Sequence, residues 1–112
     1  MTEIEILTKD KNKIVLKSQG HCQHDICVSI SALVNSVIQF TKEFEAIEKC
    51  RYKAIYEYGN VFLKINFINA DFKKDFLNGI KAVLSGLELY QFNFPKDVKF
   101  KINGVVTSTN PL

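Results

Sequence analysis

Both histidines and two of the three cysteines of this chain lie close together, within residues 20–27. A thiol and an imidazole are the groups with which cysteine hydrolases work, because a thiolate attacks a carbonyl carbon and an imidazolium protonates the leaving amine. Cys27 is the candidate nucleophile, and His21 and His24 are the candidate bases. These residue types at this spacing indicate nucleophilic catalysis by a thiol.

A helix must position Cys27, and apolar residues at helical spacing predict one from Ile26 to about Ala46. Asp25 is expected to be its N-cap, accepting a hydrogen bond from a free backbone N–H. Cys27 then lies in the first turn, where unpaired N–H groups and the helix dipole lower the pKa of a thiol and can hold an oxyanion. Gly20 allows the preceding loop an unusual backbone angle, or allows substrate backbone to approach closely.

Two other interpretations of this segment stay open. Cys27 can be a small buried residue of the helix, with the histidines exposed in a loop. His21, Cys22, His24 and Cys27 are also ligand types for zinc, although their spacing matches no common structural zinc pattern and the adjacent His21 and Cys22 are hard to direct at one ion. Cys50 has no histidine near it in the sequence and is expected to be structural.

The composition is that of one globular domain. The chain has 112 residues, of which 46% are hydrophobic and 24% charged, with only 5 Gly and 2 Pro, so a disordered or collagen-like protein is excluded. The net charge of +3 does not indicate a direct nucleic-acid partner, and the short apolar runs predict no membrane partner. An odd number of cysteines favours free thiols, and we expect a cytoplasmic protein.

Alternating apolar residues predict the strands. Ile4 and Ile6 alternate with acidic residues in a first strand, and a second follows at 14–16. The clearest hairpin joins 52–58 to 61–67 across the turn Gly59-Asn60, and its two-residue loop fixes the register. The predicted pairs, which share one face, are Tyr58–Val61, Tyr56–Leu63, Ala54–Ile65 and Tyr52–Phe67.

A second helix, capped by Asp71 and carrying Phe76 to Tyr90 on its buried stripe, is predicted to end before Pro95. Val98, Phe100 and Ile102 then form a last strand. The resulting order β-β-α-β-β-α-β predicts an α+β fold, a mixed sheet with two helices packed on it. Residues 1–104 are expected to form a single domain, and 105–112 a polar, frayed tail.

The segment around Cys27 resembles the signature of the ribosomal-processing cysteine protease Prp family. Members carry a Gly-His pair, a loop of variable length, and a helix start similar to Asp-Ile-Val-Cys-Ala-Ala-Val-Ser; here Gly20-His21 is followed by Asp-Ile-Cys-Val-Ser-Ile-Ser-Ala-Leu at 25–33. A second stretch, Gly-Leu-Glu-Leu-Tyr at 86–90 followed by Phe94-Pro95, is also similar to the family. The order of predicted elements agrees, so the resemblance covers nearly the whole chain.

The resemblance implies a bacterial cysteine endopeptidase without a cofactor. It would remove the N-terminal extension of a large-subunit ribosomal protein precursor during ribosome assembly, with that N-terminal peptide as its partner and a homodimer as its assembly. By position, Cys27 matches the nucleophile and His21 the general base. Gly20 matches the loop glycine, and Ser31 the serine one turn after the nucleophile.

Three features depart from the family pattern. Cys22 stands where the family usually has alanine, and the loop from His21 to Cys27 is at the short end. His24 occupies the place of the family's acidic residue, with Asp25 one step later. Either Asp25 orients the base or no acid does, and His24 is a second candidate for the base. The alternative functions are a catalytically silent, ribosome-associated interaction domain of the same fold and a metal-binding module.

Overall fold

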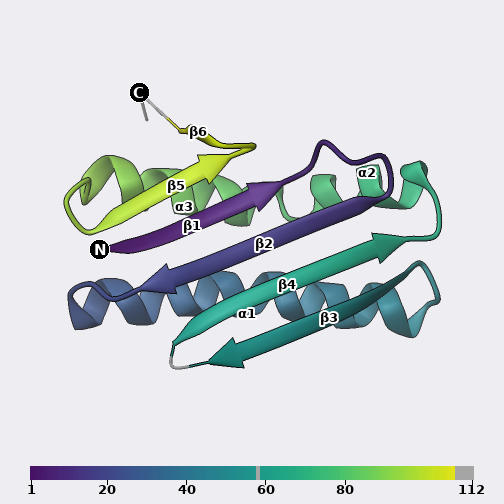
Figure 1. The fold of residues 1–112 in the computed structure, drawn as a ribbon, viewed down its shortest axis with the longest axis horizontal. Coiled ribbons are helices and arrows are strands. Elements are labelled where there is room, and N and C mark those ends of the chain that lie inside the picture. The colour runs from purple at the N-terminus through teal and green to yellow at the C-terminus, as the bar shows by residue number, and fades with distance from the viewer. Residues whose placement is uncertain (58, 108–112) are drawn as a thin grey trace.

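The computed structural model describes residues 1–57 and 59–107. Over these residues the chain forms six strands and three helices (Figure 1). The helices are α1 (His24–Ala46), α2 (Ala70–Gly79) and α3 (Lys81–Asn93). The strands are β1 (Thr2–Leu7), β2 (Lys13–Gly20), β3 (Cys50–Glu57), β4 (Asn60–Phe67), β5 (Val98–Ile102) and β6 (Val105–Val106).

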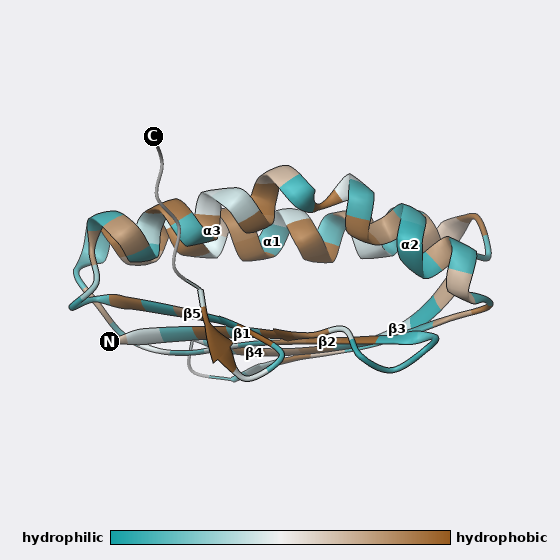
Figure 2. Ribbon diagram, turned by 90° about the horizontal axis from the view of Figure 1, so that it is seen from above, coloured by the Kyte–Doolittle hydropathy of each residue, from teal (hydrophilic) through white to brown (hydrophobic). Residues whose placement is uncertain are grey.

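The strands form one mixed sheet in the order β3-β4-β2-β1-β5-β6. β1 and β5 are parallel, and every other neighbouring pair is antiparallel. The α+β class and the mixed sheet are therefore confirmed, whereas the described residues contain three helices rather than the two expected. All three helices cover the same face of the sheet (Figure 2).

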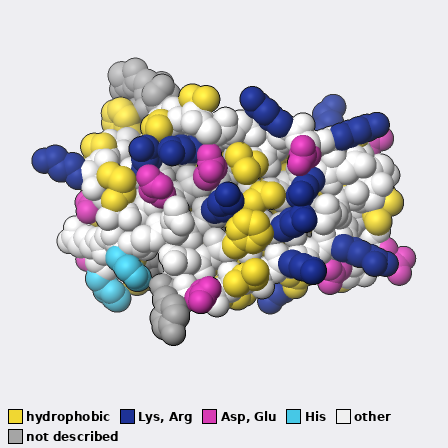
Figure 3. All heavy atoms as spheres, viewed as in Figure 1, with side chains coloured by type: hydrophobic (Ala, Val, Ile, Leu, Met, Phe, Trp, Pro, Cys, Tyr) yellow, Lys and Arg dark blue, Asp and Glu magenta, His cyan; other side chains and the backbone are white. Residues whose placement is uncertain are grey.

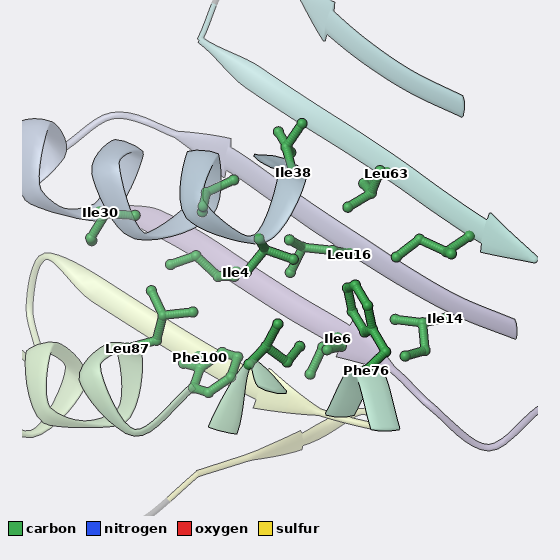
Figure 4. Packing of buried hydrophobic residues seen from close by; sticks show 14 of the residues in the cluster. Ile4, Ile6, Ile14, Leu16, Ile30, Ile38, Leu63, Phe76, Leu87 and Phe100 are labelled. Carbon is green, nitrogen blue, oxygen red and sulfur yellow. The ribbon is translucent and has the colours of Figure 1, made fainter. Parts of the chain in front are cut away.

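The core lies between the sheet and the helices. Ile4 and Ile6 point inward from β1 and are almost fully buried, as the alternation predicts. Figure 4 shows how inward-facing residues of neighbouring strands pack together with α1, α2 and α3. The strand residues buried to 1% exposure or less are Ile4, Ile6, Ile14, Leu16, Leu63, Ile65, Val98 and Phe100.

Four phenylalanine rings pack together at the end of the core that is distant from Cys27. The ring of Phe76 from α2 lies 5.2–5.3 Å, centroid to centroid, from the rings of Phe40, Phe44 and Phe67. Tilted and edge-on arrangements of this kind are favourable for aromatic side chains. The cluster joins α1, α2 and β4, so it fixes the sheet against the helix that carries Cys27.

The predicted register of the β3–β4 hairpin is wrong by two residues. Tyr56 lies opposite Val61 and Ala54 opposite Leu63, and Asn60 belongs to β4 rather than to the turn. Two-residue hairpin turns favour glycine at their second position, and Gly59, with φ +81°, takes that place. A shift of two residues keeps every side chain on its own face, so the inward residues of β4 were predicted correctly. Tyr58 lies outside the described residues.

The predicted second helix is interrupted. α2 ends at Gly79 and α3 begins at Lys81, with Ile80 between them at φ −96° and ψ 5°. Gly79 packs closely on α1, since a Cβ there would come within 2.4 Å of the Phe40 ring. Asp71 is not the cap of α2. Asn69 is the N-cap, and its side chain accepts a hydrogen bond from the N–H of Phe72 at 2.9 Å.

The chain after β5 returns to the sheet. Val105 and Val106 form β6 beside β5, and the buried Gln91 of α3 donates a hydrogen bond to Thr107 Oγ1 at 2.8 Å. The remainder of the expected frayed tail, residues 108–112, lies outside the described residues. None of the helices described here has the length and apolar character needed to cross a membrane.

Candidate active site

The candidate site lies at one end of the sheet, where β2 ends and α1 begins. β2 ends at Gly20, and α1 begins at His24, so only residues 21–23 connect them. β1 begins at the same end, since Thr2 pairs with Gly20. Figure 1 shows this loop beside the start of the chain. The site is therefore framed by β1, β2 and the first turn of α1.

Gly20 sets the path of this loop. Its φ is +93°, and a Cβ at this position would lie 2.2 Å from the carbonyl oxygen of Met1. The unusual backbone angle expected of Gly20 is thus confirmed, and the close approach is made by the chain's own backbone. The N–H of Gly20 donates to Asn60 Oδ1 at 3.1 Å, which ties the loop to β4.

The N-cap of α1 is Gln23, not Asp25. The N–H of Cys27 donates to the carbonyl oxygen of Gln23 at 2.9 Å, and Gln23 makes no side-chain capping bond. Because the loop after β2 is short, α1 begins at His24, and Asp25 is a helical residue rather than the cap. Asp25 remains in the first turn and is exposed, where its negative charge suits the helix dipole.

The sulfur of Cys27 contacts Cys22 and Thr2. The N–H of Cys22 donates to Cys27 Sγ at 3.1 Å, and the two sulfurs lie 2.9 Å apart. Thr2 Oγ1 donates to Cys22 Sγ at 3.1 Å and lies 3.8 Å from Cys27 Sγ. Both cysteines are free thiols and half-buried. The side chain of Cys27 therefore sits among hydrogen-bond donors at the edge of the core.

These contacts separate the acidities of the three thiols. The pKa of Cys27 is lowered, above all by the hydrogen bond with the Cys22 side chain and also by the Cys22 N–H and Thr2. Burial and the hydrogen bond with Cys27 raise the pKa of Cys22. Burial, with a contribution from Glu45, raises the pKa of Cys50 to about 11. Cys27 is thus the thiol best suited to act as a nucleophile.

Neither histidine ring reaches Cys27. Within residues 1–57 and 59–107, no hydrogen bond joins the ring of His21 or His24 to the Cys27 sulfur. His21 is exposed, and its ring lies beside Gly59. Its carbonyl oxygen accepts a hydrogen bond from the Met1 amino group at 2.6 Å. Figure 3 shows the histidine side chains together at the surface at one end of the molecule.

The other predicted residues of the site are exposed along α1. His24 is the first residue of α1, and Ser31 lies one turn beyond Cys27 on its exposed surface. The structure thus brings Cys27 together with Cys22 but does not bring His21, His24 or Ser31 to its sulfur. Over the described residues, no group of three or more His, Cys, Asp and Glu side chains could hold a metal ion.

Sequence reasoning missed two residues of this site, Thr2 and Asn60. Thr2 is 4% exposed and bonds to the Cys22 sulfur. Its place two residues before Ile4 puts it on the inward face, so a polar residue at a buried position was the available signal. Asn60 was assigned to the hairpin turn. No local pattern connects it to Gly20, which lies forty residues earlier.

Taken together, the fold and the site define a small α+β domain with an activated thiol at the start of its longest helix. No protein-family model matches the sequence, and no curated protein matches it significantly. Solved structures do match. The chain has the fold of the ribosomal processing protease Prp.

Three of the matching structures illustrate this likeness. The essential ribosomal processing protease Prp from S. aureus, in complex with a covalently linked product peptide, has a TM-score of 0.63 at 16% identity over 91% of this chain and 99% of that one. The same protease with a substrate peptide gives 0.56 at 13% identity over 91% and 99%. SMU.848 from Streptococcus mutans gives 0.60 at 18% identity over 91% and 96%.

Proposed function

We propose that this protein is a cysteine endopeptidase that removes the N-terminal extension of a large-subunit ribosomal protein precursor. Cys27 is the nucleophile and His21 the general base and acid. The observation that carries the proposal is the Cys27 sulfur near the start of α1, where it accepts a hydrogen bond from the Cys22 N–H at 3.1 Å, in a fold shared with a protease whose structures include bound peptides.

In this proposal the Cys27 thiolate attacks the carbonyl carbon of the scissile peptide bond. The Cys27 N–H is bonded to the Gln23 carbonyl oxygen, whereas the N–H groups of His24, Asp25 and Ile26 precede it in α1 and are the ones proposed to meet the developing oxyanion. His21 then protonates the leaving amine. His24 is the second candidate for this step.

The base must move to take part. His21 belongs to the short loop at 21–23 and is exposed, so a rearrangement of this loop around the substrate brings its ring toward Cys27. Catalytic hydrogen bonds commonly tighten only in the substrate complex. In this proposal Gly20 supports the loop, and Asp25 and Ser31, which are exposed on α1, act as supporting residues.

A hollow lies beside His21, and Cys27 is not among the residues that line it. It has a volume of about 510 Å³ and is lined by Met1, Glu3, Gln19, Gly20, His21 and Asn60. Its Glu3 carboxylate lies 3.9 Å from Lys99 Nζ, so a basic residue of the peptide would compete with this ion pair. The proposed partner is the N-terminal peptide of the precursor, bound along the end of the sheet that carries His21.

The test is cleavage of the organism's own ribosomal protein precursor, with the new N-terminus read by mass spectrometry. We expect the unmodified protein to cleave, Cys27→Ala to abolish cleavage, and Cys50→Ala, a matched thiol control, to retain it if folded. Comparison of His21→Ala with His24→Ala identifies the base. Cleavage by Cys27→Ala at an undiminished rate, or no cleavage by the unmodified protein, would overturn the proposal.

One observation favours the second candidate, a catalytically silent interaction domain. Neither histidine ring is bonded to Cys27 in the described residues, as it would be in a preformed Cys-His pair. Such a domain would bind ribosomal particles or the precursor without cutting it. Binding measured in a pull-down with the precursor, together with an unchanged precursor mass, would support this function.

The assembly and location belong to the same proposal. We expect a cytoplasmic homodimer, with no direct nucleic-acid partner and no membrane partner. β3 forms one edge of the sheet within the described residues, and such an edge can pair with a second copy. Sedimentation equilibrium reads the assembly directly: a molar mass of one chain at all concentrations contradicts the dimer.

A further inference from the structure

The contact between the two sulfurs at the start of α1 has a chemistry of its own. Cys22 Sγ and Cys27 Sγ lie 2.9 Å apart while both residues are thiols. A disulfide bond is about 2.05 Å long, so bond formation requires the sulfurs to move together by only about 0.9 Å. Cys22 lies in the loop before α1 rather than in the helix, and its N–H donates to the Cys27 sulfur, so the two residues already face one another.

The two thiols differ in a way that gives each a separate role. Cys27 has a lowered pKa, because it accepts hydrogen bonds from the Cys22 N–H and side chain. Cys22 has a raised pKa, chiefly through burial. A thiolate reacts with peroxides much faster than a thiol does. Cys27 is therefore the residue that a peroxide attacks, and Cys22 is the neighbouring thiol that can react with the product.

We propose that Cys22 and Cys27 are an oxidative modification site, at which a peroxide converts the pair into a reversible disulfide that shields the Cys27 sulfur from irreversible oxidation. Any effect of this disulfide on peptidase activity rests on the proposed function, whereas formation of the disulfide itself does not.

Hydrogen peroxide oxidises the pair in two steps. The Cys27 thiolate attacks one oxygen of hydrogen peroxide, the O–O bond breaks, and Cys27 becomes a sulfenic acid while the released hydroxide takes a proton to form water. The Cys22 sulfur then attacks the Cys27 sulfur, the S–O bond breaks, and the hydroxide leaves as water with the Cys22 proton. The two thiols lose two electrons and two protons in total, and the peroxide is reduced to two molecules of water.

Cys50 is an internal control. It is 2% exposed, and its pKa is raised to about 11. Its sulfur bonds to the Thr41 carbonyl oxygen at 3.8 Å, at the opposite end of α1 from Cys27. A buried, protonated thiol reacts slowly with peroxide, so Cys50 should remain a free thiol under conditions that oxidise the pair.

The chain offers a direct readout. Trypsin cleaves after Lys17 and Lys42 and at no position between them, so Cys22 and Cys27 fall in one peptide, 18–42, while Cys50 falls in another. After brief treatment with hydrogen peroxide we expect this peptide to lose the mass of two hydrogens and to become resistant to alkylation. Dithiothreitol should restore its original mass. Cys50 should remain open to alkylation in the unfolded protein.

The variant Cys22→Ala removes the resolving thiol, and Cys50→Ala is its matched control. We expect peptide 18–42 of Cys22→Ala to gain two oxygens, as a sulfinic acid that dithiothreitol does not reverse. Cys50→Ala should form the disulfide as the unmodified protein does. A circular dichroism spectrum confirms that each variant is folded. The proposal is overturned if the unmodified protein forms no disulfide in peptide 18–42, or accumulates sulfinic acid as fast as Cys22→Ala.

Activity is measured separately, each protein against its own untreated rate on the precursor. We expect peroxide to inactivate the unmodified protein by more than tenfold, with recovery in dithiothreitol, and to inactivate Cys22→Ala without recovery. If no protein cleaves the precursor but the disulfide still forms, the proposed function fails and the modification site stands. If cleavage is found but peroxide yields no disulfide, the modification site alone fails.

Discussion

The side chain of Asn60 and the backbone of Gly20 are joined by a hydrogen bond from the Gly20 N–H to Asn60 Oδ1, 3.1 Å long. This bond connects the start of β4 to the end of β2, at the point where the chain leaves the sheet for α1. The neighbouring Gly59 contacts the His21 ring from the same hairpin. The β3–β4 hairpin therefore supports the loop that carries the candidate base, although it contributes no candidate catalytic residue.

Asn60→Ala is expected to loosen this loop. Loss of the acceptor should increase the rate of hydrogen exchange at the Gly20 amide by about fivefold, since an intramolecular hydrogen bond contributes about 1 kcal/mol. Hydrogen exchange followed by NMR measures this rate. Asn66→Ala, an exposed asparagine of the same strand, is the control and should leave the Gly20 amide unchanged. Equal exchange in both variants would contradict a supporting role for Asn60.

Gly20→Ala should destabilise the protein more than Gly104→Ala. Both glycines have positive φ, +93° and +81°, so both substitutions carry the left-handed backbone penalty of about 1–2 kcal/mol. Only at position 20 does the new Cβ meet backbone, 2.2 Å from the Met1 carbonyl oxygen, whereas no atom lies within 4 Å at Gly104. Urea unfolding measures both. Equal free energies of unfolding would show that the close approach to Met1 has no cost.

The fold was predictable where one side of an element is buried. Ile4 and Ile6 alternate with exposed residues because a sheet covered on one face imposes a period of two. A period of two shows which face a side chain is on, but two registers that differ by two residues give the same faces. The partner of Tyr56 was therefore predicted as Leu63, whereas it is Val61. Likewise, helical spacing continues through Gly79, so the pattern of apolar residues does not show the interruption at Ile80.

The site was predictable to the extent that it is local. Cys27 could be placed near the start of a helix from its neighbours alone. Thr2 could not be placed at its sulfur, because the two residues are 25 positions apart and threonine is common in strands. Asp25 was wrongly assigned as the cap because the sequence does not show that β2 continues to Gly20, which leaves only a short loop before α1.

Phe76→Ala is expected to lower the free energy of unfolding by about 3–5 kcal/mol, because it leaves a cavity among the rings of Phe40, Phe44 and Phe67. Phe76 is 0% exposed and contacts all three. Phe92→Ala, at a residue 51% exposed, is the control and should change stability by less than about 0.5 kcal/mol. Denaturant unfolding compares the two. Similar losses would refute the aromatic cluster as the anchor between α1, α2 and β4.

The alkylation of Cys27 should begin at a lower pH than that of Cys50. The thiolate is the reactive form, and a lowered pKa gives Cys27 a larger thiolate fraction near neutral pH. Cys50, with a pKa of about 11, should stay almost unreactive until the pH approaches that value. Rates with iodoacetamide across pH, with the site assigned by peptide fragmentation, give a midpoint for each thiol.

Substitution at Cys22 tests the cause of that difference. Cys22→Ala removes the side-chain hydrogen bond that lowers the pKa of Cys27 most, so the Cys27 midpoint should move upward, toward that of an ordinary thiol at about 8.5. Thr2→Val, which removes a second hydrogen bond to the pair, should move it in the same direction by a smaller amount. The Cys50 midpoint should not change in either variant. A Cys27 midpoint that stays low in Cys22→Ala would instead assign the effect to the Cys22 backbone N–H, which this substitution leaves in place.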